Sequence, residues 1–149
     1  MRMIALLYCL SFSVIVSAQD IGTLYNTAKD YYLKGEYEKG IPYAEKVVEL
    51  GKTELGEKSS EYGTCINLLG LLYVRTGAYG KAEPLFFTAR EIKRQTAGEE
   101  DADHITITEN LVWVYLKTGQ YAKAEPLYIW LAGIKAKLLG ENDPAYAAA

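Results

Sequence analysis

The stretch TGAYGKAEPL, residues 76–85, returns as TGQYAKAEPL at residues 118–127. A more diverged copy, KGEYEKGIPY, lies the same distance upstream at residues 34–43. Glycine, tyrosine, lysine and proline keep their places in all three copies. A fixed period of about 42 residues is typical of repeat architectures, in which each unit needs its neighbours to bury its apolar face. The chain is therefore expected to be built from copies of one unit.

The composition of this stretch predicts a tight turn between two helices. Its glycine accepts the positive φ that ends the first helix. Its tyrosine is expected to wedge between the two helices. A small residue three positions later allows the backbones to approach closely, and these residues are Gly40, Ala82 and Ala124. The proline lies early in the second helix, where it removes one backbone donor and predicts a slight bend.

Capping residues with the same period mark the helix ends. Ser59, Asp101 and Asp143 lie one period apart and are good N-cap residues. A glycine precedes each of them by three residues and is expected to end the second helix of its unit. The three units are expected at about 19–58, 60–101 and 102–143, and residues 144–149 begin a fourth. The helices are predicted near residues 21–33, 37–54, 60–75, 79–96, 102–117 and 121–138.

Apolar residues spaced by three and four define one face of each helix, as expected for helices that pack against their neighbours. Burying one such side chain fully contributes about 1.5–3 kcal/mol. Trp130 aligns with Thr88 and is expected to face outward, toward a following repeat. The inward positions of the second and third units are predicted to be Ile66, Leu69, Tyr73, Ala82, Phe86, Ala89, Ile92, Leu111, Tyr115, Ala124, Tyr128, Leu131 and Ile134.

Residues 1–18 have the pattern of a secretory signal peptide. Arg2 provides a positive start, residues 4–16 form a largely apolar run, and Ser17 and Ala18 form a small-residue cleavage site. The run is shorter than the roughly 20 residues that span a membrane. The mature domain is therefore expected to cover residues 19–149. It is expected to be exported, to the periplasm or the extracellular space, and to have no membrane span.

The sequence carries no pattern of catalytic, cofactor-binding or metal-binding residues. The net charge is −3, and the clustered lysines and arginines of a nucleic-acid surface are missing. No glycine-rich phosphate loop is present, and no Cys or His pair has metal-ligand spacing. His104 is interpreted as a packing residue at a helix start, and Cys65 as a small buried hydrophobe. We therefore predict that the protein is not an enzyme and binds neither a cofactor nor nucleic acid.

Three strings together resemble the tetratricopeptide repeat of the kinesin light chain type: NLLGLLY (67–73), TGAYGKAEPL (76–85) and Gly98-Glu99. That family pattern reads Leu-Asn-Asn-Leu-Ala-x-Leu-Tyr, then Gly-x-Tyr-x-Lys-Ala-Glu-Pro-Leu-Tyr, then Leu-Gly-x-x-His-Pro-Asp. The chain departs from it at residues 40–41, where Gly-Ile replaces Ala-Glu, and at residues 108–112, which read TENLV. The resemblance covers essentially the whole mature chain. It implies an all-α, right-handed solenoid of three helix pairs plus the start of a fourth. Together with the signal-peptide pattern, we expect a bacterial, exported protein of this repeat type.

The resemblance also implies where a partner binds. In repeats of this type the first helices line a concave face, and a few of their positions contact the ligand. For Leu71 and Trp113 the alternative is packing between neighbouring first helices. The implied function is a non-catalytic scaffold that holds a peptide or a segment of a protein partner. By register, the candidate partner-binding residues are Tyr25, Lys29, Asn67, Leu71, Arg75, Glu109, Trp113 and Lys117.

Two other functions stay open at this point. By analogy with other proteins that carry such repeats, the chain is the repeat region of a larger protein with a caspase-like protease or a sensor-kinase domain downstream. In the third hypothesis the chain is a self-associating structural module. Its C-terminal end is then the contact surface, because the last helix presents a stripe of Leu127, Leu131, Ile134 and Leu138.

Overall fold

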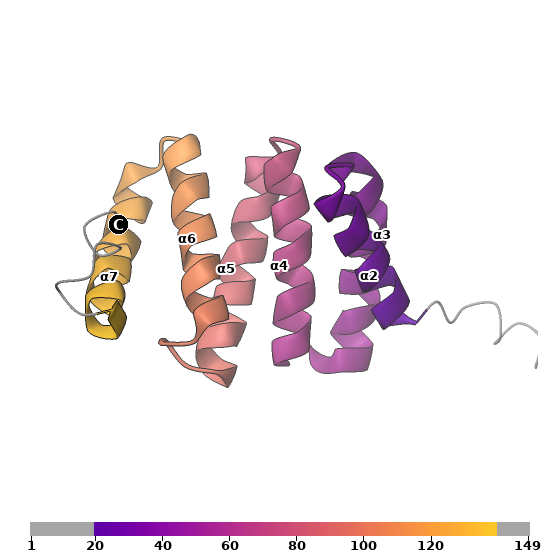
Figure 1. The fold of residues 1–149 in the computed structure, drawn as a ribbon, viewed down its shortest axis with the longest axis horizontal. Helices are drawn as coiled ribbons and strands as arrows, with labels where there is room; N and C mark the ends of the chain where they lie inside the picture. The colour runs from indigo at the N-terminus through magenta and orange to yellow at the C-terminus, as the bar shows by residue number, and fades with distance from the viewer. Residues whose placement is uncertain (1–19, 140–149) are drawn as a thin grey trace, which may run out of the picture.

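The computed structural model describes residues 20–139, and every regular element in that range is helical. The predicted signal peptide and the predicted start of a fourth unit lie outside the described residues. Figure 1 shows the helices side by side along one axis. The elements are α2 (Ile21–Leu33), α3 (Tyr37–Gly51), η1 (Lys52–Gly56), α4 (Ser60–Arg75), α5 (Tyr79–Thr96), α6 (Ala102–Lys117) and α7 (Tyr121–Leu139).

The predicted helix boundaries agree with the structure at nearly every end. The one clear difference is the second helix, predicted to run to residue 54. Regular α-helix stops at Gly51, and the chain continues through the π-helical turn η1. π-Helical turns are rare and have no simple sequence pattern. This turn places Leu55 against a small core cluster that contains Val47 and Cys65.

The predicted turns and caps are present. Gly35, Gly77 and Gly119 have φ of 76°, 76° and 72°, the left-handed region that favours glycine. The Ser59 hydroxyl accepts a hydrogen bond from the amide of Tyr62 at 3.1 Å, as expected for an N-cap. Asp101 caps α6 in the same way, by accepting from two backbone amides. The period of the sequence is thus also a period in backbone geometry.

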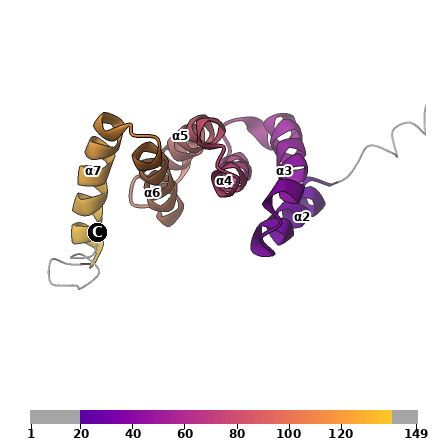
Figure 2. The ribbon, with the colours of Figure 1, turned by 90° about the horizontal axis from the view of Figure 1, so that it is seen from above.

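The helices form an arc of antiparallel pairs, that is, an all-α solenoid. In Figure 2, which looks down on the helices, α2, α4 and α6 lie on the inner side of the arc, and α3 and α5 lie on the outer side. α4 and α6 each pack against the second helix of their own unit and of the unit before it, and α2 packs against α3 of its own unit. The inner surface is therefore built by three consecutive first helices.

The predicted core of the second unit is confirmed, and that of the third unit is only partly correct. All seven predicted inward positions of the second unit are buried, as are Leu111, Tyr115, Ala124 and Leu131. Ile134 is half-buried. The Tyr128 side chain was predicted to be buried, and this is wrong, because 49% of its surface is exposed.

The exposure of Tyr128 follows from a change in the helix that faces it. In the second unit the Phe86 ring is fully buried against Gly70, where an added Cβ would lie only 2.8 Å from the ring. One period later, Val112 takes the place of Gly70 and Tyr128 takes the place of Phe86. The branched Val112 side chain occupies the space that the ring would need, so the ring of Tyr128 lies outside the core.

The prediction that Trp130 faces outward is also wrong. The Trp130 ring is half-buried and packs edge-on against His104, with ring centres 5.0 Å apart, and the Arg90 guanidinium lies 5.9 Å from it. The prediction was based on the aligned residue, Thr88. A threonine side chain is too short to reach α6, so its surroundings do not predict the contacts that the larger Trp130 ring makes there. His104 itself is fully buried, which confirms its interpretation as a packing residue.

Candidate functional site

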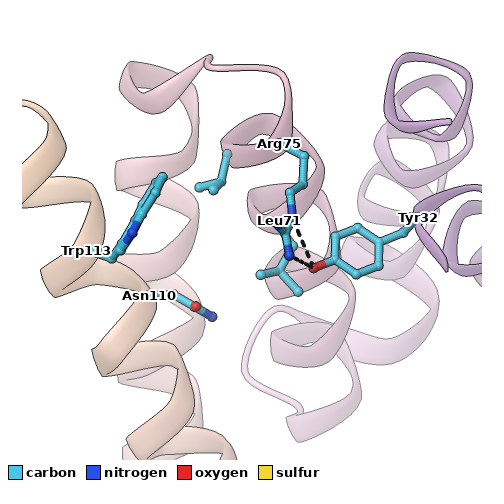
Figure 3. Close-up of a pocket in the computed structure, with 6 residues that line it drawn as sticks. Tyr32, Leu71, Arg75, Asn110 and Trp113 are labelled. Carbon is cyan, nitrogen blue, oxygen red and sulfur yellow. Dashed lines mark hydrogen bonds between the residues drawn. The ribbon is translucent and has the colours of Figure 1, made fainter. Parts of the chain in front are cut away.

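A pocket of about 390 Å³ opens on the inner surface of the arc (Figure 3). Side chains from all three first helices line it, so it exists only when the units are stacked. Its volume lies in the range of small ligand or side-chain pockets. The lining residues are Tyr32 from α2, Leu71, Val74 and Arg75 from α4, and Asn110 and Trp113 from α6.

Helical spacing brings these side chains together. Leu71, Val74 and Arg75 stand three and four residues apart on α4, and Asn110 and Trp113 stand three apart on α6. Residues at such spacings lie next to one another on a helix surface. Arg75 is the last residue of α4, where a positive charge interacts favourably with the helix dipole.

Arg75 forms one wall of the pocket and is held by aromatic side chains. Its Nε and Nη2 donate hydrogen bonds to the Tyr32 hydroxyl at 3.4 and 3.3 Å. Its guanidinium lies 5.7 Å from the Tyr32 ring and 5.9 Å from the Tyr37 ring. The hydrogen bond to Tyr32 raises the pKa of Arg75, so this side chain keeps its charge. A guanidinium has five N–H donors, so donors remain for a ligand.

Trp113 forms the opposite wall. Its ring packs edge-on against Tyr79, with ring centres 5.5 Å apart, and 40% of its surface stays exposed. The Lys117 ammonium lies 5.2 Å from the centre of the same ring, an arrangement that favours a cation–π interaction. Leu71 is half-buried and also contacts the core. Leu71 and Trp113 thus contribute both to packing and to the open surface.

The inner surface near this pocket carries positive charge that has no acidic partner within residues 20–139. Arg75, Lys117 and Lys29 form no ion pair with any carboxylate in that range. The carboxylate of Glu109, on the same helix as Lys117, is neutralised by Lys135 at 3.0 Å. The pocket therefore favours an anionic group, although the chain as a whole is acidic.

The eight residues predicted as partner-binding do not all meet at one place. Leu71, Arg75 and Trp113 line the pocket, and Lys117 lies beside it. Glu109 and Tyr25 line two other depressions, one toward each end of the arc, and Lys29 is exposed on α2. Asn67 is half-buried one turn before Leu71. Its Oδ1 is buried and has no hydrogen-bond partner in the part of the chain that the structure describes, and such an oxygen is normally paired.

Sequence reasoning missed Tyr32, Val74 and Asn110. Tyr32 and Val74 stand one period apart, so they occupy the same position of the repeat. The repeat register could therefore have predicted both residues. Asn110 is different, because its register partner Leu68 is a buried core residue. Only the three-dimensional arrangement shows that Asn110 reaches the pocket.

The arrangement contains no group set up for covalent chemistry. The Cys65 thiol is buried, and burial raises its pKa, which keeps it protonated and unreactive. Among residues 20–139, no cluster of His, Cys, Asp and Glu side chains has a geometry that would hold a metal ion. None of the helices that the structure describes combines the length and the apolar character needed to cross a membrane. The surface is suited to holding a partner by shape, charge and aromatic contact.

Comparison with solved structures gives the same fold. The chain resembles the BtubC (BKLC) protein of P. vanneervenii with a TM-score of 0.74 and 22% identity, over 87% of this chain and 53% of that one. It also resembles a putative kinesin light chain of Podosopora anserina that has nearly identical TPR-like repeats. The TM-score is 0.74 and the identity 20%, over 88% of this chain and 64% of that one. A variant of the latter gives a TM-score of 0.65 at 20% identity, over 78% and 55%. This chain thus spans between half and two thirds of the length of these structures.

Comparison of sequences identifies the family. No curated protein sequence gives a significant match to the chain. The family profile of the tetratricopeptide repeat matches residues 20–95, which is just over half of the chain. The helix pairs, the repeat period and the structural neighbours agree with that match. The chain belongs to the tetratricopeptide repeat family.

Proposed function

We propose that this protein is a non-catalytic scaffold that holds a peptide, or a segment of a partner protein, on the inner surface of its arc. Tetratricopeptide repeat domains generally bind protein partners, and the family is generally non-enzymatic. The observation that carries the proposal is the pocket shared by α2, α4 and α6. It joins an apolar and aromatic wall to a guanidinium that has no acidic partner within residues 20–139.

The chemistry of the pocket indicates what it holds. An acidic side chain of the partner would pair with the free donors of Arg75, and charge-assisted hydrogen bonds of this kind are strong and directional. A neighbouring apolar side chain would pack between Leu71 and Trp113. The amide of Asn110 would bond the partner's backbone. Charge of this kind fixes the register and orientation of a bound segment.

The test is a selection of peptides from a displayed random library on the immobilised chain, followed by binding measurements with two matched double variants. We expect the selected peptides to be acidic. Arg75→Glu with Lys117→Glu should weaken their binding at least tenfold, which corresponds to about 1.4 kcal/mol. Lys46→Glu with Arg94→Glu makes the same charge change at exposed residues of the outer helices and should leave binding nearly unchanged. Equal losses in both variants would exclude the pocket as the binding site.

A second candidate function is self-association through the C-terminal end, which we also propose. The predicted stripe on the last helix is bare only in part, because Leu131 is buried and Leu127 packs against the core. Leu138 of the stripe is 50% exposed, and apolar side chains outside the stripe are exposed there as well. These are Leu116, Tyr121, Tyr128 and Ile129, between 47% and 67% exposed. Sedimentation of the purified chain tests this proposal, and we expect a concentration-dependent increase in mass.

Two further proposals concern the whole protein. We propose that the chain is exported after cleavage behind Ala18, and N-terminal sequencing of secreted protein that begins at Gln19 would support this. The alternative of a larger protein, with a protease or kinase domain that follows the repeats, is tested by the coding sequence downstream of the Ala149 codon. A stop codon directly after Ala149 would exclude it.

A further inference from the structure

A second pocket lies where the first helices begin. Its volume is about 410 Å³, and it opens at the start of α2 and α4, whereas the pocket beside Arg75 lies where these two helices end. Most of its surface is apolar, and its lining includes two acidic side chains and no basic one. The lining residues are Asp20, Ile21, Gly22, Tyr25, Asn26, Leu55, Glu61, Thr64 and Cys65.

Helical spacing places the two pockets on the same surface. Tyr25 and Tyr32 of α2 stand seven residues apart, close to two full turns, and each lines one of the pockets. Glu61 and Arg75 of α4 stand fourteen residues apart, close to four full turns, and also line one pocket each. Residues at such spacings share one face of a helix. Both helices lie on the inner side of the arc (Figure 2), so a single segment lying along them can contact both pockets.

The junction between α4 and α6 shows which side chain fits between the starts of two first helices. There the side chain of Lys93, from α5, is only 6% exposed, and its ammonium lies 2.8 Å from the carboxylate of Asp103. The same ammonium donates a hydrogen bond to the Ser60 hydroxyl at 2.9 Å. One period earlier, Glu61 takes the place of Asp103 and Gly51 takes the place of Lys93. The junction between α2 and α4 thus keeps the carboxylate and lacks the lysine.

The carboxylate of Glu61 has no cationic partner within residues 20–139, since none of the ion pairs in that range includes it. Tyr25 lines the same pocket, and tyrosine rings of this chain accept ammonium groups, as Lys81 does 5.1 Å from the centre of the Tyr73 ring. A long basic side chain packs its apolar stem on apolar surface and keeps its charged head beside a carboxylate or a ring. The pocket therefore suits a basic side chain.

We infer that this pocket holds a lysine or arginine side chain of the same bound segment whose acidic side chain pairs with Arg75. The inference rests on the function proposed above and adds a second, opposite charge to the partner. The stem of the basic side chain packs against Ile21 and Leu55, and its head pairs with Glu61. Because the two ends of the inner surface then select opposite charges, the segment can bind in one direction only.

The distance between the two charges follows from helix geometry. The fourteen residues from Glu61 to Arg75, at about 1.5 Å each, correspond to about 21 Å along α4. An extended segment rises about 3.3 Å per residue, so about six residues cover this distance. An even number of residues also places both side chains on the same face of the segment. We therefore expect a lysine or arginine about six positions from the acidic residue.

Parallel selections from a displayed random peptide library test this inference. They use the full chain, the variant Glu61→Lys and the control Glu38→Lys. Glu38 is a matched control because it is exposed and lies in the first turn of α3, as Glu61 does in α4. The full chain and the control should select peptides with an acidic residue and, about six positions away, a basic one. Glu61→Lys should still select the acidic residue but not the basic one, and its circular dichroism spectrum should stay helical.

Binding measurements with one selected peptide give a second readout. Replacing its basic residue by alanine should weaken binding to the full chain by about fivefold, the upper range for an accessible ion pair, and should change binding to Glu61→Lys much less. Acidic peptides without a basic preference, or equal losses with both chains, would overturn this inference and leave the proposed function standing. Selected peptides that carry no acidic residue would overturn the proposed function as well.

Discussion

Adding one methyl group at Gly70 tests the packing that separates the second unit from the third. The Cβ of Gly70→Ala would lie 2.8–3.1 Å from three carbons of the Phe86 ring; the shortest of these distances is one that real Cβ atoms essentially never show, and the other two are unusually tight. Phe86 is fully buried, so its ring has no free space into which to move. We expect this crowding to cost about 1–3 kcal/mol.

Helix propensity acts in the opposite direction, so the variant needs a matched control. Replacing glycine by alanine inside a helix stabilises it by about 1 kcal/mol. Gly133 lies inside α7, and a Cβ built there meets nothing within 4 Å. Gly133→Ala should therefore show the propensity gain alone. Gly70→Ala should be less stable than Gly133→Ala by about 1–3 kcal/mol, the size of the crowding term.

Urea unfolding followed by far-UV circular dichroism measures both variants. The double variant Gly70→Ala with Phe86→Leu adds a direct test of the contact, because the smaller side chain should relieve the crowding. The coupling energy between two residues in contact is typically about 0.5–3 kcal/mol. If Gly70→Ala stabilised the chain as much as Gly133→Ala does, the explanation for the exposed Tyr128 would be wrong.

Two further predictions concern titratable side chains. Burial lowers the pKa of His104, and its Nε2 has no hydrogen-bond partner within residues 20–139. Stability should therefore be fully present above about pH 6.5, the pKa of histidine in the unfolded chain, and should decline as the pH falls below it. His104→Tyr, which places there the residue found at Tyr62, should remove this decline in urea titrations at a series of pH values. Burial and the hydrogen bond to Glu45 raise the pKa of Tyr73 to about 12, so stability should fall as the pH rises from about 10 toward that value. Burial also raises the pKa of Tyr25, Tyr62 and Tyr115, so ultraviolet titration should find several late-titrating tyrosines, and the latest of them should be missing in Tyr73→Phe.

The period of the sequence predicted the fold because it repeats chemistry that acts locally. Helices begin after the N-caps Ser59 and Asp101 and end before Gly77 and Gly119. These residues act through their own backbone and side-chain chemistry, independently of the neighbouring helices. The same register identified Leu71, Arg75 and Trp113 of the pocket. Local signals of this kind are readable without any knowledge of neighbouring helices.

The errors lie where two helices have to be considered together. The exposure of Tyr128 depends on Val112, a residue of the facing helix, and alignment with Phe86 does not contain that information. Trp130 was placed by its alignment with Thr88, although a long ring can reach contacts that a threonine cannot. Asn110 enters the pocket only because three units stack into an arc. Each of these depends on side-chain shape across an interface.

The most direct test of the central claim uses the two tryptophans of the chain, Trp113 and Trp130. Trp113 lines the pocket, and Trp130 packs against His104, away from it. A selected acidic peptide is titrated into the single-tryptophan variants Trp130→Phe and Trp113→Phe, and the emission is recorded. Binding on the inner surface predicts a saturable change in the emission of Trp113 and none in that of Trp130. Peptide binding that leaves the emission of Trp113 unchanged would contradict the account.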